Sequence, residues 1–254
     1  MDATLFTRWV FPSLLVSLRV APVFTFAPPF TLIRTPALFR VLLAVGVAAC
    51  LVSARPAASA VGDMTVGRAM AAAARELFLG MVFALAFQLA FGALQTAGRT
   101  IDIQAGYGLA VLIDPSTQAQ TPLIGSLFTY AAGAVFFAIG GHAELLRLLA
   151  ASLDAIPIGQ AQPLASLGPL AGLCSSVFAL ALGVAGGMIL CLFLADLAIA
   201  AMSRTIPQMN VLVLGLQAKT LATLLILPVV IGGSGGLLLR LLRTTLDGVP
   251  GLIR

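Results

Sequence analysis

The sequence is short of charge, and lysine and histidine are its rarest charge-bearing residues. Only 9% of its 254 residues are charged, and lysine and histidine occur once each, at Lys219 and His142. A soluble domain carries roughly 25% charged residues, so this chain lacks the polar surface that would keep it in water. Its hydrophobic content of 60% and mean hydropathy of +1.10 agree with this deficit. The sequence therefore predicts an integral membrane protein.

Signatures of catalysis and of metal binding are also missing. A single histidine and scattered carboxylates offer no metal-ligand spacing. No GxSxG, P-loop or HExxH pattern occurs. An odd number of cysteines without CxxC spacing argues against a disulfide framework and favours packing roles, at Cys50, Cys174 and Cys191. We therefore predict no enzyme, no cofactor and no metal site.

The net charge of +5 comes from arginine residues that separate apolar runs. In a soluble protein such an excess of basic residues could indicate nucleic-acid binding. The sequence, however, shows no surface pattern that combines aromatic and basic residues, as nucleic-acid binding proteins do. The placement of the arginines fits membrane-flanking anchors instead. The sequence predicts contact with membrane lipid and no nucleic-acid partner.

The apolar runs predict an all-α membrane protein of about six helical segments, arranged as broken helices and hairpins. A span needs about 20 apolar residues, and the length suits a single domain over residues 1–254. The glycine run from Gly232 to Gly236 is predicted to end the last helix and leave a basic tail. The expected segments are 5–30, 37–54, 77–98, 123–143, 167–202 and 211–231.

Among the charged residues inside these segments or at their ends, Arg19, Glu76, Asp196 and Lys219 are candidate intramembrane or intersubunit charges. An unpaired charge at a helix centre in lipid costs at least about 2.5 kcal/mol. Arg19 is therefore expected either to face protein, water or a carboxylate, or to extend to an interface. Glu76 is expected to cap its helix or to pair with a neighbouring subunit. Asp196 and Lys219 are further candidates for intramembrane or intersubunit charges.

The helical pattern breaks between Arg99 and Gly125. This stretch is too apolar for a solvated loop and too interrupted by glycine and proline for a helix. Irregular backbone at membrane depth is tolerated only where it is buried in protein or lines water. We predict a non-helical loop within this stretch, between the third and fourth segments. Its candidate residues are Gly106, Tyr107, Gly108, Leu109, Val111, Leu112, Ile113, Asp114, Pro115 and Pro122.

Five stretches, taken in order, carry a resemblance that covers nearly the whole chain. They are Arg19-Val-Ala-Pro22, Glu76-Leu-Phe-Leu-Gly80, the run from Ile101 to Gly125, Gly141-His142 with Ile156-Pro157-Ile158-Gly159, and Arg204-Thr-Ile-Pro207-Gln-Met-Asn210. Together they resemble the FliR family of flagellar type III export-gate subunits, with the SctT-type injectisome subunits as close relatives. Asp114-Pro115 and Gly141-His142 look more like the flagellar form.

The resemblance implies a set of partners and a location. FliR-like chains join FliP-like and FliQ-like subunits in a helical ring in the bacterial inner membrane, at the flagellar basal body. FlhB-like and FlhA-like export components belong to the same apparatus. Unfolded export substrates pass through the central channel, and a loop of the FliR-like subunit helps to plug it. The positions that match this loop are Gly106 to Pro122.

Other interpretations remain open at this stage. The chain could be the SctT-type subunit of a virulence secretion system. It could also be a secondary transporter or a small-solute channel, in which Arg19, Asp196 and Lys219 form a midplane site. No internal repeat supports the transporter. The loop itself could merely connect two helices outside the membrane.

Overall fold

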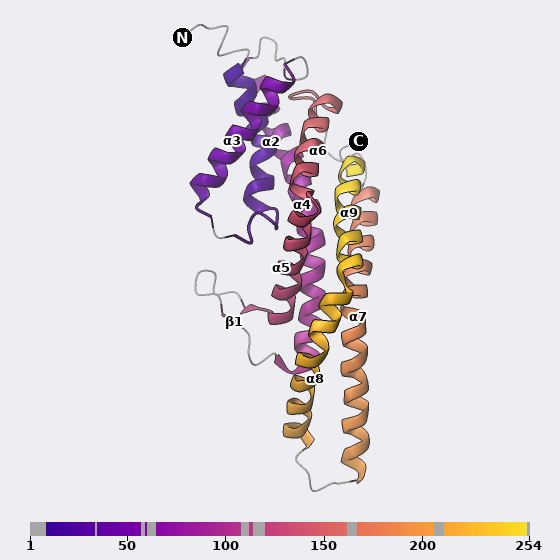
Figure 1. Ribbon diagram of the computed structural model, residues 1–254. Helices are drawn as coiled ribbons and strands as arrows, with labels where there is room; N and C mark the ends of the chain where they lie inside the picture. Colours follow the sequence, from indigo (N-terminus) through magenta and orange to yellow (C-terminus); the bar gives the residue numbers. More distant parts are fainter. Residues whose placement is uncertain are drawn as a thin grey trace. The chain divides into compact units, whose positions relative to one another are not determined.

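The computed structural model describes residues 9–33, 35–56, 59, 65–107, 112–113, 120–161, 167–205 and 211–252. Its regular elements are helices, apart from one pair of two-residue strands (Figure 1). The predicted all-α class is therefore confirmed. The helices are α2 (Phe11–Phe26), α3 (Ala37–Ala54), α4 (Val66–Ala105), α5 (Leu123–Ala138), α6 (Gly141–Ala155), α7 (Gly168–Thr205), α8 (Val211–Gly233) and α9 (Gly235–Leu252).

The apolar helices confirm the expectation of about six segments. Four stretches in the described residues are long and apolar enough to cross a membrane, namely Ala37–Ala54, Val66–Ala105, Gly168–Thr205 and Gly215–Gly233. The pair α5 and α6 can form a fifth, broken span, and α2 is a shorter apolar helix. Helices α3 and α8 leave many large apolar side chains exposed. Such surfaces suit contact with lipid or with another membrane helix.

The third segment is longer than the sequence indicated. Helix α4 has 40 residues, and at 1.5 Å per residue it is about 60 Å long, roughly twice the hydrocarbon core of a bilayer. It begins at Val66 because the alanine-rich lead-in favours helix. It continues to Ala105, so residues 99–105 of the predicted break are helical. Gly106, with φ of +85°, follows its last residue, as glycine commonly does after a helix.

The chain folds into two compact units, which are described separately. Unit 1 comprises Met1–Leu89, Phe136–Cys174 and Arg243–Arg254, and unit 2 comprises Ala90–Val135 and Ser175–Leu242. Helices α4, α5, α7 and α9 contribute residues to both units. The single domain over residues 1–254 stays a prediction.

In unit 1, small residues bring helices close together. A Cβ added at Gly80 of α4 would lie 2.4 Å from the carbonyl oxygen of Arg19 and 2.9 Å from Cγ of Pro22, both on α2. Helix α3 packs on α2 and buries Ala44, Ala48 and Val52, one residue in every four. This spacing is the usual one for close helix contact in membranes.

In unit 2, the carboxyl-terminal part of α4 packs directly on the start of α5. A Cβ added at Gly98 would lie 2.3 Å from Cα of Gly125. Conversely, a Cβ added at Gly125 would lie 2.8 Å from the carbonyl oxygen of Gln95. Two glycines facing each other therefore let the two backbones touch, on either side of the predicted loop.

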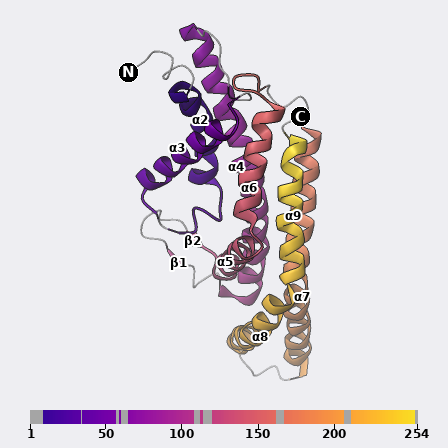
Figure 2. The same ribbon diagram turned by 45° about the horizontal axis from the view of Figure 1, so that its top comes forward.

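The basic tail was mispredicted, because it forms a regular helix. The glycine run ends α8, and after a turn at Ser234 the chain continues as α9. Helix α9 lies beside α7 in both ribbon views (Figures 1 and 2), with Leu237 near Gly183 in unit 2 and Gly248 near Leu173 in unit 1. Its leucines recur at helical spacing and would have predicted an amphipathic helix. The buried ones are Leu238, Leu241, Leu242, Leu246 and Leu252.

The close approach at Gly80 is directly testable. Gly80→Ala should lower the thermal unfolding temperature of the detergent-solubilised protein, because overpacking between backbones costs about 1–3 kcal/mol. Gly92→Ala on the same helix is the matched control, since nothing lies within 4 Å of its added Cβ. The control should be neutral or more stable. Equal unfolding temperatures for Gly80→Ala and the parent protein would contradict the packing.

Candidate functional site

A fully buried ion pair joins α2 to α4 in unit 1. Nε of Arg19 donates to Oε2 of Glu76 at 2.7 Å, and Nη2 donates to Oε1 at 3.0 Å. Both side chains have no exposed surface. The two parallel bonds match the planar guanidinium to the carboxylate, which is the strong form of this interaction. Glu76 lies inside α4 rather than at its head, because the helix begins ten residues earlier.

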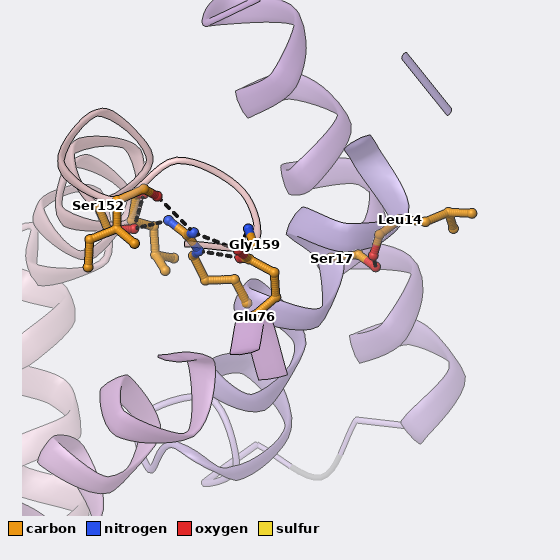
Figure 3. Close-up of polar contacts among 8 residues, drawn as sticks. Leu14, Ser17, Glu76, Ser152 and Gly159 are labelled. Carbon is orange, nitrogen blue, oxygen red and sulfur yellow. Dashed lines mark hydrogen bonds and ion pairs between the residues drawn. The ribbon is translucent and has the colours of Figure 1, made fainter. Parts of the chain in front are cut away.

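The pair is completed by α6 and by the turn that follows it. Nη1 of Arg19 donates to the hydroxyl of Ser152 at 3.0 Å, and Nη2 donates to the carbonyl of Ile156 at 3.1 Å. Oε1 of Glu76 accepts the backbone N–H of Gly159 at 2.9 Å. Figure 3 shows Ser152, Glu76 and Gly159 converging from three parts of the chain. We call Arg19, Glu76, Ser152, Ile156 and Gly159 the buried charge cluster.

In the turn after α6, both the N–H and the carbonyl of Gly159 are hydrogen-bonded to side chains of α4. The adjacent side chain on α4, Arg75, donates to the Gly159 carbonyl at 2.8 Å, while Glu76 accepts its N–H. Gly159 has φ of +78°, a left-handed conformation that glycine adopts without steric cost. Two consecutive residues of α4 thus fix one turn.

These contacts compensate the cost of burying two charges. An isolated buried charge is very unfavourable, whereas a paired and fully hydrogen-bonded one is tolerated. The structure places Arg19 against a carboxylate, which is the first of the two alternatives derived from the sequence. Glu76 pairs within its own chain.

A second ion pair links α7 and α8 in unit 2. Nζ of Lys219 contacts Oδ1 of Asp196. The lysine side chain is 21% exposed and the aspartate 40%, so this pair is less enclosed than the buried charge cluster. The hydroxyl of Thr223 also donates to the Lys219 carbonyl at 2.8 Å. The four charges singled out in the sequence therefore form two pairs.

The predicted loop coincides with the only strand pairing that the described residues contain. Helix α4 ends at Ala105 and α5 begins at Leu123. Between them, Leu112–Ile113 (β1) pairs antiparallel with Gln120–Thr121 (β2), in the register Leu112 to Thr121 and Ile113 to Gln120. The connection is thus a hairpin, a detail that the glycine and proline pattern did not reveal.

Several of the loop's candidate residues cannot be placed. The structure describes Gly106, Tyr107 and Pro122 in full, and it describes only the backbone of Leu112 and Ile113. Outside the described residues lie Gly108, Leu109, Val111, Asp114 and Pro115.

Both ends of the loop contact other elements of unit 2. The carboxylate of Asp102 accepts the backbone N–H of Ile124, at 3.1 Å to Oδ1 and 3.2 Å to Oδ2. The hydroxyl of Tyr107 donates to the carbonyl of Thr220 on α8 at 3.4 Å.

Sequence reasoning missed Asp102, Ser152 and the backbone role of Gly159. Asp102 stands 22 residues before its partner Ile124, and Ser152 stands 133 residues after Arg19. Partners at such separations follow no local pattern. The position of Asp102 could have predicted a hydrogen-bonded side chain, because a carboxylate at the end of an apolar segment needs a hydrogen-bond donor.

The fold and the cluster define a helical membrane protein in which Arg19 pairs with Glu76 and Lys219 with Asp196. Among the described residues, no group of three or more His, Cys, Asp or Glu side chains could hold a metal ion. Its described polar contacts join segments of the chain to one another.

Comparison with known proteins identifies the family. The profile of the bacterial export proteins, family 1, matches residues 10–245. The flagellar biosynthetic protein FliR of Bacillus subtilis (strain 168) is 32% identical over 228 residues, which is 86% of this chain and 85% of that protein. The chain belongs to the bacterial export proteins, family 1, on the FliR branch, which confirms the resemblance seen in the sequence.

Shorter similarities extend to both branches of the family. FliR of Escherichia coli (strain K12) is 30% identical over 145 residues, covering 56% of this chain and 55% of that protein. The Yop proteins translocation protein T of Yersinia pestis is 30% identical over 156 residues, or 60% of each chain. The chain is therefore a membrane protein of bacterial protein export.

The buried charge cluster generates a stability prediction. Arg19→Leu should destabilise the protein by roughly 3–5 kcal/mol, because it leaves Glu76 charged and unpaired in the interior. Adding Glu76→Gln should restore part of the loss, since the neutral amide still accepts the Gly159 N–H. Thermal unfolding in detergent measures both changes.

The matched control is Arg147→Leu. Arg147 forms an exposed pair with Glu144 on α6, and such pairs are worth about 0–1 kcal/mol. Equal losses for Arg19→Leu and Arg147→Leu would show that the buried charge cluster does not hold unit 1 together.

Proposed function

We propose that this chain is a structural subunit of the flagellar type III protein-export gate, in the bacterial inner membrane at the flagellar basal body. It assembles with FliP-like and FliQ-like subunits into a channel for unfolded flagellar proteins. FlhA-like and FlhB-like export components are further partners. The observation that carries the proposal is the similarity to a flagellar FliR over 86% of the chain.

The hairpin between α4 and α5 is the part of the chain best suited to help close the pore. It lies between two apolar helices. Non-helical backbone at the depth of the membrane is tolerated only where it is buried in protein or lines water. Its apolar run from Leu109 to Ile113 provides side chains that can exclude water. Moving one short connection is a local change, which costs less than moving whole helices.

The intrahelical charges speak against the transporter alternative. A substrate site at the midplane needs charges that are available to a ligand. Arg19 instead binds Glu76, Ser152 and Ile156, and Lys219 binds Asp196. These charges serve contacts within the chain.

Deleting Tyr107 to Gln120 tests the role of the loop. The complex should still assemble, because the helices keep their own contacts, but it should leak ions and small solutes. Ion flux across vesicles or cells that hold the complex is the measurement. Deleting residues 60–64 between α3 and α4 serves as the control and should stay tight. A loop-deleted complex as tight as its parent would refute the plug role.

Co-expression tests the proposed partner subunits, and deletion of the gene tests whether the chain serves a flagellum or an injectisome. The chain should co-purify with FliP-like and FliQ-like subunits from its own host, whereas a transporter should purify as a functional monomer or small homo-oligomer. Removing the gene should abolish flagellar filaments and swimming. Intact filaments together with a loss of effector secretion would assign the chain to an injectisome instead.

A further inference from the structure

One ion pair of unit 2 lies at an exposed, mainly apolar surface. Asp196 on α7 contacts Lys219 on α8, inside two segments that are apolar enough to cross a membrane. The two helices lie side by side (Figures 1 and 2). We call Asp196 and Lys219, together with the exposed side chains of Phe193 and Leu216, the α7–α8 face. All four residues belong to unit 2, so the face is described within one compact unit.

The acidic member of the pair is the more open one. The side chain of Asp196 is 40% exposed, against 21% for Lys219. A carboxylate can accept about four hydrogen bonds, and contact with one ammonium group uses only part of this capacity. The buried charge cluster, by contrast, encloses both of its charges completely. The α7–α8 face therefore presents mainly a negatively charged hydrogen-bond acceptor to its surroundings.

Large apolar side chains border this acceptor. Phe193 precedes Asp196 by three residues on α7, and Leu216 precedes Lys219 by three residues on α8. Residues three apart are neighbours on a helix surface, so each apolar side chain lies beside the charge that follows it. Both Phe193 and Leu216 are exposed. The surface around the ion pair is therefore apolar, with a charged group set into it.

Neither lipid nor water alone suits such a surface. Ionised side chains within membrane segments are costly in contact with lipid, and they normally face protein or a water-filled cavity. Large apolar side chains favour leaving water. A second membrane helix meets both requirements if it packs on the apolar side chains and brings a polar group to the charge, as helices in membranes do.

We propose that the α7–α8 face binds a membrane helix of another subunit, and that this helix places a basic side chain opposite Asp196. This inference rests on the proposed function, because the partner helix belongs to another chain of the export complex. Lys219 holds the Asp196 carboxylate in position between α7 and α8, and the partner's cation uses the remaining acceptor capacity. A charge contact of this kind fixes the register of the two chains and excludes wrong partners.

Exchanging the two charges tests the sign of the partner group. Asp196→Lys combined with Lys219→Asp keeps an ion pair within the chain but turns a cation toward the partner. Recovery of the partner subunits with the chain should fall about ten-fold or more, because like charges placed across an interface strongly oppose association. The matched control is Glu144→Arg with Arg147→Glu, which exchanges another exposed pair and should leave recovery at the parental level.

A photocrosslinker in the otherwise unaltered chain tests the same face without changing a charge. With Phe193→p-benzoylphenylalanine, irradiation of the assembled complex should produce an adduct between this chain and a partner subunit. An adduct with lipid alone, or no adduct, would overturn the inference. Thermal unfolding in detergent shows whether the charge-exchanged chain is folded, and parental recovery of partners by that folded chain would overturn the inference as well.

The two proposals fail in different ways. If the parent chain recovers no FliP-like or FliQ-like subunit, the proposed function is wrong, and the inference is wrong with it. If the parent recovers these subunits and the charge-exchanged, folded chain recovers them equally well, the proposed function stands. In that case Asp196 does not meet a basic side chain of a partner, and the α7–α8 face is not the contact surface.

Discussion

The bidentate bond between Arg19 and Glu76 is the constraint on which unit 1 depends. Two full charges inside an apolar helical assembly are tolerated only if every donor and acceptor finds a partner. That requirement brings Ser152 and the backbone of Ile156 and Gly159 to the pair. Gly80 lets α4 approach α2 closely enough for the contact to form. The specificity of the packing therefore comes from polar atoms, while apolar area supplies most of the burial.

Unit 2 uses the same chemistry for a different purpose. Asp102 lies in α4 like Glu76, but it binds the start of another helix rather than a cation. The bond fixes where α5 begins and hence where the connecting hairpin ends. Helix α4 thus supplies one carboxylate that stabilises a helix bundle and one that positions a loop. The hairpin proposed to help close the pore lies next to the second carboxylate.

Composition and periodicity predicted the class, most of the helical segments and a break between the third and fourth segments, because these depend on local sequence. They placed the start of the break at Arg99, whereas α4 continues to Ala105. They did not predict which charges pair. Arg19 and Glu76 are 57 residues apart, and only the packing of α2 on α4 selects that partner. The tail was mispredicted because the glycine run from Gly232 to Gly236 indicates a helix end, whereas the chain resumes a helix at Gly235. The hairpin register was also inaccessible, since two-residue strands leave no alternation to detect.

The sequence separation within the buried charge cluster has a consequence for biosynthesis. Arg19 is translated 57 residues before Glu76 and 133 before Ser152. At bacterial rates of about 5–20 residues per second, the carboxylate follows the guanidinium by about 3 to 11 seconds. During that interval the first helix carries an uncompensated cation. Since an unpaired charge is costly in an apolar environment, we expect the contacts of α2 with α4 and α6 to form only after these later helices have been synthesised.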